Sequence, residues 1–211
     1  MNENGIRGFL HSPVNPTGKG LLLTHGAGAN CHSPLLLALS REFCAAGFAV
    51  LRYDLPFRQL RPTGPPLRTA DKDQQGIADA IAWMKTRVSG RIFASGHSYG
   101  GRMTTMLAAR EPNLAAGLLL LSYPLHPPKA PAQMRTAHFP GLQTPALFVH
   151  GTRDGFGSID ELATALRLVP AKTRLLPVDS AGHELISKKN ESQLPGTIVQ
   201  SFAEFNFAVD G

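Results

Sequence analysis

Short apolar runs alternate along the chain with longer segments whose apolar residues recur at helical spacing. Such alternation is typical of βαβ units, which build a mostly parallel sheet covered by helices on both faces. Most of the runs are apolar throughout, as expected of strands that are buried on both sides. We therefore predict an α/β fold whose central sheet has about seven strands. The expected strands lie within residues 5–10 and at 20–25, 48–54, 91–96, 117–123, 145–151 and 173–178.

Recognisable start and stop signals bound the predicted helices. Ser33 followed by Pro34 can begin a helix that Gly47 ends, and Ser158 with Glu161 has the spacing of a capping box. Two more helices are predicted from apolar residues that share one helical face. The residues of these faces, which we expect in the core, are Ile77, Ile81, Met84 and Val88 in the first helix and Ile198, Phe202 and Phe205 in the second.

The length of 211 residues fits a single domain over positions 1–211. Hydrophobic residues make up 43% and charged residues 17% of the chain, which excludes a disordered protein. The N-terminal segment lacks an apolar core of signal-peptide length, and the longest apolar stretch, LAAGLLLLSYPL, is too short to span a bilayer. Only Cys31 and Cys44 are present, which excludes a disulfide framework. We therefore expect a cytoplasmic protein with no membrane partner.

The formal charge of +6 permits attraction to nucleic acid or to acidic ligands. The Lys and Arg residues are scattered and form no run, so we expect them to be solvated and predict no nucleic-acid partner. The densest basic group flanks the Pro-rich stretch LPFRQLRPTGPPL, and it would favour acidic ligands. This group consists of Arg52, Arg58, Arg61 and Arg68.

A serine between two glycines, in the stretch RIFASGHSYGGRM, is the strongest sign of chemistry. GHSYG at 96–100 matches G-x-S-x-G, a string that alone is weak. Here it follows a predicted strand and precedes a helix that Pro112 ends, which is the arrangement of a nucleophile elbow. Such a turn holds Ser98 in a strained backbone conformation, and strand and helix then pass too closely for side chains at Gly96 and Gly100. The N–H of Tyr99 and the helix dipole would favour negative charge on a substrate oxygen.

A serine hydroxyl needs a neighbouring base, and the base needs a group to orient it. His183 lies in DSAGHELI after the last predicted strand, and Asp154 lies in HGTRDGFG after the strand at 145–151. The order Ser98, Asp154, His183 is that of an α/β-hydrolase. Asp54 also follows a strand and is a rival orienting acid, but it precedes the serine.

Several motifs together resemble the α/β-hydrolase family from about residue 20 to the end. They are HGAGAN, LRYDLPF, GHSYGGR, LSYPLHPP, HGTRDGFG and AGHE, and they are similar to those of the small, lidless, dienelactone-hydrolase-like group that includes the testis-expressed and NSL-complex-subunit-like hydrolases. The resemblance implies that Ser98 is the nucleophile, His183 the general base and then acid, and Asp154 the orienting carboxylate. It also implies that the N–H of Ala27 joins that of Tyr99 in an oxyanion hole.

The chain departs from larger members of that family in two ways. Before residue 20 there is room for one strand at most, and residues 124–144 are too few for a helical lid domain. We therefore expect a shallow, open site for small esters or thioesters, with the loop at 55–68 and Tyr123 at its rim. His126 and His138 are candidates for substrate contact, whereas His97 should point elsewhere. No cofactor is required, and a homo-oligomer is compatible with the sequence.

Other readings of the same residues stay open at this point. GAGANC with Asp54 resembles a degraded dinucleotide fingerprint, although Cys31 replaces its third glycine. Cys31 is also a conceivable thiol nucleophile, but it lies on a different element from the elbow. Neither H-E-x-x-H nor CxxC occurs, so no metal site is expected. A non-catalytic interaction protein on a hydrolase fold is the main alternative function, since fold alone does not establish activity.

Overall fold

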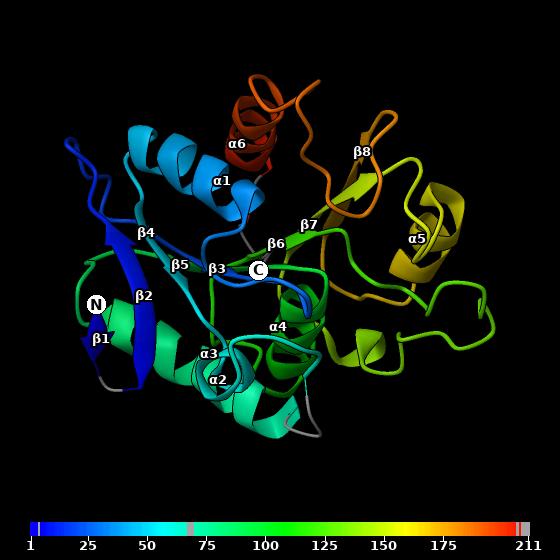
Figure 1. The fold of residues 1–211 in the computed structure, drawn as a ribbon, viewed down its shortest axis with the longest axis horizontal. Helices are drawn as coiled ribbons and strands as arrows, with labels where there is room; N and C mark the ends of the chain where they lie inside the picture. The colour runs from blue at the N-terminus through cyan, green and yellow to red at the C-terminus, as the bar shows by residue number, and fades with distance from the viewer. Residues whose placement is uncertain (4, 67–69, 206, 208–211) are drawn as a thin grey trace.

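The computed structural model describes residues 1–3, 5–66, 70–205 and 207, which build one eight-stranded sheet in the order β1-β2-β4-β3-β5-β6-β7-β8 (Figure 1). The strand β2 is antiparallel to β1 and β4, and every pair from β4 to β8 is parallel. The strands are β1 (Asn2–Glu3), β2 (Ile6–His11), β3 (Gly20–Thr24), β4 (Ala49–Tyr53), β5 (Ile92–His97), β6 (Leu118–Leu121), β7 (Ala146–Gly151) and β8 (Thr173–Val178).

The predicted mostly parallel α/β sheet is confirmed, and its seven expected strands are all present. The eighth strand, β1, was not predicted, so the expectation of one strand at most before residue 20 is wrong. The two polar residues of β1 carry no apolar pattern, and this strand exists because it pairs with β2.

Helices cover both faces of the sheet, as Figure 1 shows. The residues of α1 and α6 pack in one apolar core, and those of α3, α4 and α5 pack in the other. The bounds are α1 (Pro34–Ala45), α2 (Pro56–Leu60), α3 (Ala70–Lys85), α4 (Tyr99–Arg110), α5 (Ile159–Leu166), α6 (Leu194–Glu204) and a 3-10 turn η1 (Phe139–Gly141).

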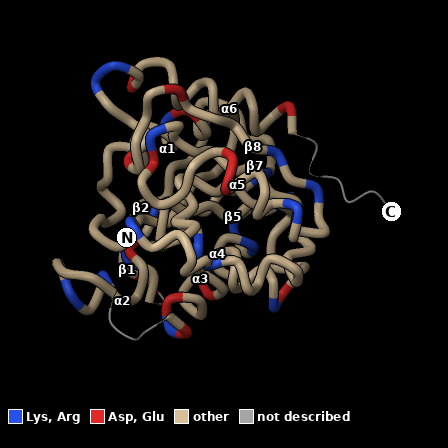
Figure 2. The backbone as a smooth tube through the Cα atoms, turned by 90° about the vertical axis from the view of Figure 1, so that its right-hand side faces the viewer, with Lys and Arg blue, Asp and Glu red and all other residues tan. Residues whose placement is uncertain are grey.

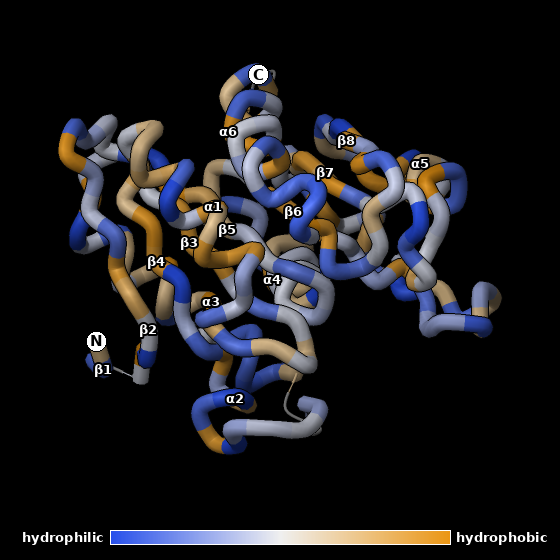
Figure 3. Tube along the Cα trace, turned by 45° about the horizontal axis from the view of Figure 1, so that its top comes forward, coloured by the Kyte–Doolittle hydropathy of each residue, from blue (hydrophilic) through white to orange (hydrophobic). Residues whose placement is uncertain are grey.

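Successive side chains of the central strands belong alternately to the two apolar cores. Leu22 in β3 faces the core of α3 and α4, whereas its neighbours Leu21 and Leu23 face the core of α1 and α6. Successive side chains of a strand point to opposite faces, so a strand covered on both sides must be apolar at every position. Figure 3 shows this as orange along β3, β4, β6 and β7, while Figure 2 shows Lys and Arg scattered along the chain.

The predicted helix signals agree with the structure at two helices. Ser33 caps α1 by accepting a hydrogen bond from the Leu36 N–H, and Ser158 with Glu161 forms the capping box of α5. The helix α3 ends at Lys85, so Val88 lies beyond it and is only partly buried against the core. The stretch 55–68, predicted as irregular, contains the short helix α2, which Pro56 begins.

The parallel strands β3 to β8 bring their carboxyl ends to one edge of the sheet. Between β6 and β7, residues 122–145, all of them described, contain η1 as their one helical turn and thus hold no helical lid. Among the described residues, no helix has both the length and the apolar character that a membrane crossing requires.

Candidate active site

Ser98 lies in the sharp turn that joins β5 to α4. Its φ of 51° and ψ of −114° place it in a region that non-glycine residues rarely occupy, and its N–H donates to the Leu121 carbonyl at 2.8 Å. A Cβ atom at Gly96 would collide with the Gly101 nitrogen, and one at Gly100 would collide with Thr24 Oγ1. The glycines therefore allow the close passage of strand and helix that exposes the Ser98 hydroxyl.

Ser98, His183 and Asp154 form one chain of hydrogen bonds. Ser98 Oγ lies 2.7 Å from His183 Nε2, and His183 Nδ1 lies 2.8 Å from Asp154 Oδ2 and 3.0 Å from Oδ1. The three residues follow β5, β8 and β7, whose carboxyl ends share one edge of the sheet. An ionised Asp154 accepts from Nδ1–H, which leaves Nε2 free to accept the serine proton.

Asp154 is held ionised in a buried setting. Burial opposes its charge, but the hydrogen bond with His183 and the Phe156 N–H donated at 2.8 Å outweigh that effect, so the pKa of Asp154 is lowered. His150, whose Nε2 lies 3.7 Å from Asp154 Oδ2, lowers the pKa of Asp154 further. The same Nε2 donates a hydrogen bond to the Gly157 carbonyl. The carboxylate is therefore fixed by several partners and stays charged at neutral pH.

A cavity of about 280 Å³ opens beside Ser98. We call it the Ser98 cavity, and it is lined by Gly26, Ala27, Gly28, Ala29, His97, Ser98, Phe156, His183 and Glu184. Ala27 is on the loop after β3, and Tyr99 is the first residue of α4. Tyr99 is not among the residues that line the cavity, and in the described part of the chain neither the Ala27 N–H nor the Tyr99 N–H is found donating to a backbone carbonyl. Both are thus free of a backbone acceptor, as donors for a substrate oxygen must be.

His25 fixes the start of that loop. Its Nε2 accepts the Leu55 N–H at 3.1 Å, so its protonated Nδ1 donates to the Gly26 carbonyl at 2.8 Å. Burial lowers the pKa of His25 to about 4, so the ring is neutral at pH 7. Because the Gly26 carbonyl and the Ala27 N–H belong to one peptide unit, His25 also sets the direction of the Ala27 N–H.

Two rival residues have structural partners away from His183. Asp54 accepts hydrogen bonds from the Cys31 N–H at 2.8 Å and from Arg7 at 3.0 Å. Burial, together with Asp54, raises the pKa of the Cys31 thiol to about 12, which leaves it protonated and unreactive at neutral pH. Neither is among the residues that line the Ser98 cavity.

Two residues of the site were missed by sequence reasoning. His97, expected to point elsewhere, lines the Ser98 cavity, and its Nε2 donates to the His183 carbonyl at 2.8 Å. Burial lowers the pKa of His97, so its ring is neutral. Phe156 stacks on the His183 ring with centroids 4.1 Å apart. The signal available in the sequence was that His97 and Phe156 lie next to or near Ser98 and Asp154. Sequence spacing, however, does not determine where their side chains point.

Three residues predicted near the substrate lie elsewhere. Tyr123 is 1% exposed, and its hydroxyl donates to the Arg135 carbonyl at 2.7 Å, so its place at the rim is wrong. His126 Nδ1 lies 2.8 Å from the Pro127 carbonyl, and His138 Nε2 lies 2.9 Å from Thr105 Oγ1. None of the three lines the Ser98 cavity.

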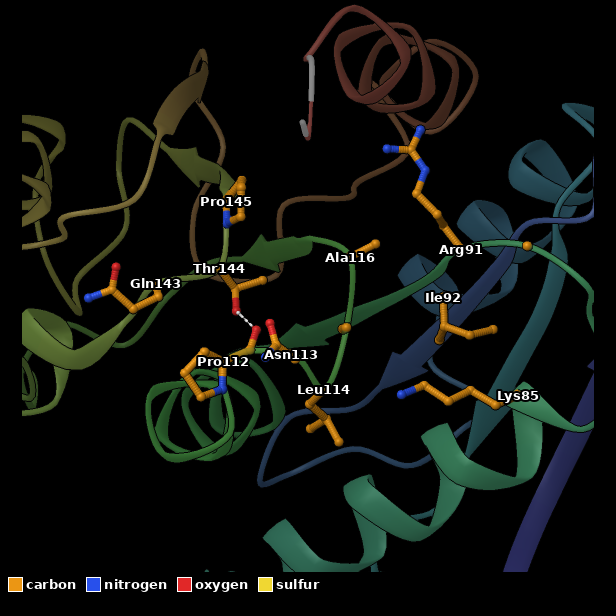
Figure 4. A pocket seen from close by; sticks show the side chains of 12 residues that line it. Lys85, Arg91, Ile92, Pro112, Asn113, Leu114, Ala116, Gln143, Thr144 and Pro145 are labelled. Carbon is orange, nitrogen blue, oxygen red and sulfur yellow. Dashed lines mark hydrogen bonds between the residues drawn. The ribbon is translucent and has the colours of Figure 1, made fainter. Parts of the chain in front are cut away.

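A larger hollow of about 480 Å³ lies at the opposite, amino edge of the sheet, between the starts of β5, β6 and β7 (Figure 4). Lys85 and Arg91 lie on one side of it, and Thr144 donates to the Pro112 carbonyl on the other. The described residues that line it include no histidine, cysteine or carboxylate. This hollow therefore offers no candidate nucleophile or base of these types. Across the described residues, no cluster suited to a metal ion is found either.

Comparison with known proteins gives a consistent family. Residues 17–207 match a family model described as "Alpha/beta hydrolase domain". A putative carboxymethylenebutenolidase of Escherichia coli (strain K12) is 26% identical over an alignment of 166 residues, which covers 69% of this chain and 60% of that protein. A Salmonella typhimurium protein of the same description gives the same figures. The chain thus spans about 60% of the length of these curated relatives.

Solved structures share the fold over nearly the whole chain. A dienelactone hydrolase from Anabaena variabilis has a TM-score of 0.75 and 21% identity, covering 96% of this chain and 93% of that one. Est1E from Butyrivibrio proteoclasticus, with ferulic acid bound, has a TM-score of 0.76 and 17% identity at 95% and 96% coverage. XC6422 from Xanthomonas campestris, described as a serine hydrolase without lid, has a TM-score of 0.71 and 15% identity at 95% and 89% coverage.

Proposed function

The chain belongs to the alpha/beta hydrolase family, and we propose that it is a serine hydrolase that cleaves small carboxylic esters or thioesters through an acyl-enzyme intermediate. The observation that carries this proposal is the hydrogen-bonded chain from Ser98 Oγ through His183 to Asp154. The esterase and dienelactone-hydrolase character of the similar proteins supports the same reaction class.

Acylation follows from the positions of the three side chains. Ser98 Oγ attacks the carbonyl carbon while its proton passes to His183 Nε2, and the ionised Asp154 stabilises the resulting imidazolium. The carbonyl oxygen becomes an oxyanion that the N–H groups of Ala27 and Tyr99 stabilise. His183 then gives its proton to the departing alcohol or thiol, and the acyl group stays on Ser98.

Deacylation repeats these steps with water. His183 Nε2 takes a proton from the water that attacks the acyl carbon, and it returns that proton to Ser98 Oγ as the acid leaves. No cofactor takes part in either half. The ionised Asp154 accepts from Nδ1–H and so fixes the tautomer in which Nε2 can act as base.

The substrate is inferred from the size and openness of the Ser98 cavity. A volume of about 280 Å³ fits a small acyl or alcohol group, and residues 122–145 add no helical cover. We therefore propose a small-molecule ester-type substrate as the partner, in the cytoplasm, with no nucleic acid or membrane involved. The closer placement in the testis-expressed and NSL-complex-subunit-like group stays a prediction.

The test combines hydrolysis with covalent labelling. Wild-type protein should hydrolyse p-nitrophenyl acetate and react with a fluorophosphonate on the peptide that contains Ser98. Because the triad acts as a unit, Ser98→Ala and His183→Ala should lower kcat by comparable factors, on the order of 10⁴ to 10⁶. Absence of hydrolysis in a folded wild type would favour the non-catalytic interaction protein, and label on another peptide would overturn the site.

A further inference from the structure

Arg58 is a buried arginine whose guanidinium binds backbone carbonyls. It is 2% exposed, and it donates to Ala29 at 2.8 Å and to Ala27 at 2.6 Å, both on the loop after β3. Its remaining bonds go to the carbonyls of Arg61 and Gly64, at 3.1 and 3.0 Å. Within the described residues it forms no ion pair with a carboxylate. The prediction that it belongs to a solvated basic patch is therefore wrong.

The patch as a whole does not form on the described surface. Arg52 is also buried, with 5% exposure, and donates to the Cys31 carbonyl at 2.6 Å. Arg68, the last member of the predicted group, lies outside the described residues. Arg52 thus binds a carbonyl outside the 26–29 turn, whereas Arg58 binds two carbonyls within it.

The carbonyls bound by Arg58 belong to a turn that has two accessible forms. The Ala29 N–H donates to the Gly26 carbonyl at 3.1 Å, so Gly26 to Ala29 form a β-turn whose central peptide joins Ala27 to Gly28. Types I and II of such a turn differ by reversal of this central peptide, and type II needs a positive φ at the third residue. Gly28 does not have a positive φ here, although glycine permits it at little cost.

Reversal of the Ala27–Gly28 peptide would turn its carbonyl oxygen toward a substrate oxygen, while the Ala27 N–H, in the preceding peptide held by His25, would keep its direction. Gly26, Ala27, Gly28 and Ala29 line the Ser98 cavity and Arg58 does not, so the Ala27 carbonyl bound by Arg58 points away from the cavity. In the reversed form this carbonyl would lose its buried partner and turn toward the cavity. A carbonyl oxygen there repels an oxyanion, whereas an N–H stabilises it.

We propose that Arg58 is a positioning residue that holds the 26–29 turn in the form that accepts an oxyanion. This inference rests on the proposed hydrolase function. Arg58 touches no substrate, and it acts through the Ala27 and Ala29 carbonyls. Its loss should thus weaken transition-state stabilisation while leaving ground-state binding nearly unchanged.

The first experiment measures p-nitrophenyl acetate hydrolysis per active site titrated with a fluorophosphonate, for Arg58→Lys and Arg58→Met. We expect kcat to fall about 10- to 100-fold, less than the 10²- to 10³-fold typical of a deleted oxyanion donor, with KM changed less than about threefold. Arg52→Met is the matched control, since it frees the Cys31 carbonyl outside the turn. It should lower thermal stability yet keep kcat per titrated site within about twofold.

The second experiment uses Gly28→Ala, because alanine disfavours the positive φ of the reversed turn and its Cβ would meet no atom within 4 Å. The kcat loss from Arg58→Met, measured relative to Gly28→Ala alone, should be about tenfold smaller than the loss in the wild-type background. Equal losses in both backgrounds, or titrated Arg58 variants with wild-type kcat, would overturn the proposal. Insolubility of both Arg58 variants would assign a folding role instead. A wild type without activity refutes the proposed function itself.

Discussion

At Asp154, burial and hydrogen bonding shift the pKa of the carboxyl group in opposite directions. Burial favours the neutral acid, whereas His183 and the Phe156 N–H favour the anion and prevail. The anion fixes which nitrogen of His183 carries the proton, and so decides whether Nε2 can take a proton from Ser98. At the residue scale, the proposed mechanism thus depends on an acid that does not touch the substrate.

Asp154→Asn should preserve the packing but remove the acceptor that fixes the His183 tautomer. We expect kcat for p-nitrophenyl acetate to fall by about 10³ to 10⁴ at neutral pH, with the fold retained by circular dichroism. Asp54→Asn is the matched control, because Asp54 also follows a strand but is bound by Arg7 and Cys31. It should lower stability and leave kcat within a few fold. A loss below tenfold in Asp154→Asn would contradict the assigned role.

His25 makes stability depend on pH. Its pKa is about 4 in the folded protein against 6.5 in an unfolded chain, so between these values the unfolded chain binds more protons. Stability should therefore fall as the pH drops through this window, and His25 alone should account for about 2 kcal/mol between pH 7 and 5. Urea unfolding at both pH values, with His25→Gln as comparison, checks this. An equal pH dependence in the variant would exclude His25 as a source.

At the scale of elements, the turn between β5 and α4 is set by close backbone contact. Gly96, Gly100 and Gly101 lie where strand and helix nearly touch, and this contact holds Ser98 at a positive φ. His97, in the same turn, donates to the His183 carbonyl and so ties the end of β5 to the loop after β8. Ser98 and His183 are therefore connected through His97 and the backbone as well as through their own hydrogen bond.

Gly96→Ala should push the strand away from the helix, because its Cβ would meet the Gly101 nitrogen and the Gly100 backbone. Overpacking of this kind costs roughly 1–3 kcal/mol of unfolding free energy, with activity falling as Ser98 shifts. Gly196→Ala is the control of opposite sign. Its Cβ would meet nothing within 4 Å in α6, and it should stabilise the protein by up to about 1 kcal/mol. Thermal unfolding of both variants and esterase assays compare the two, and a Gly96→Ala protein as stable and active as wild type would contradict the contact.

The sequence predicted those elements whose signal is local. The apolar runs predicted seven strands, and the elbow with its downstream Asp154 and His183 predicted which side chains meet, because parallel strands end at one edge. The strand β1 is two polar residues long, and α2 is five residues within a Pro-rich stretch. Neither is long enough to show a periodic pattern of apolar residues in the sequence. The directions of Tyr123 and His97 depend on how neighbouring loops pack, which spacing alone does not contain.

The whole molecule presents its site at an uncovered edge. The six parallel strands β4 to β8 with β3 deliver Ser98, Asp154 and His183 to the same side, and residues 122–145 cross that side without a helical lid. The larger hollow at the amino edge lies at the other end of the strands. Within the described residues, the segment 122–145 therefore places no helical domain over the Ser98 cavity.

An open site should act on dissolved and aggregated substrate alike. We expect the rate with p-nitrophenyl butyrate to follow simple saturation through its solubility limit, because no lid must open at an interface. Added detergent below its critical concentration should not activate the protein. A sharp rise in rate once the ester forms a separate phase would show that some segment covers the cavity in solution.

The order of the three residues along the sheet has a consequence for when chemistry begins. Ser98 follows the fifth strand, whereas the imidazole it needs follows the eighth, at the far end of the ladder. A chain that has paired only its first six strands holds an ordinary alcohol, since nothing there can withdraw the proton. Under the proposed mechanism, Ser98 becomes reactive only when β8 has paired with β7, because His183 follows β8.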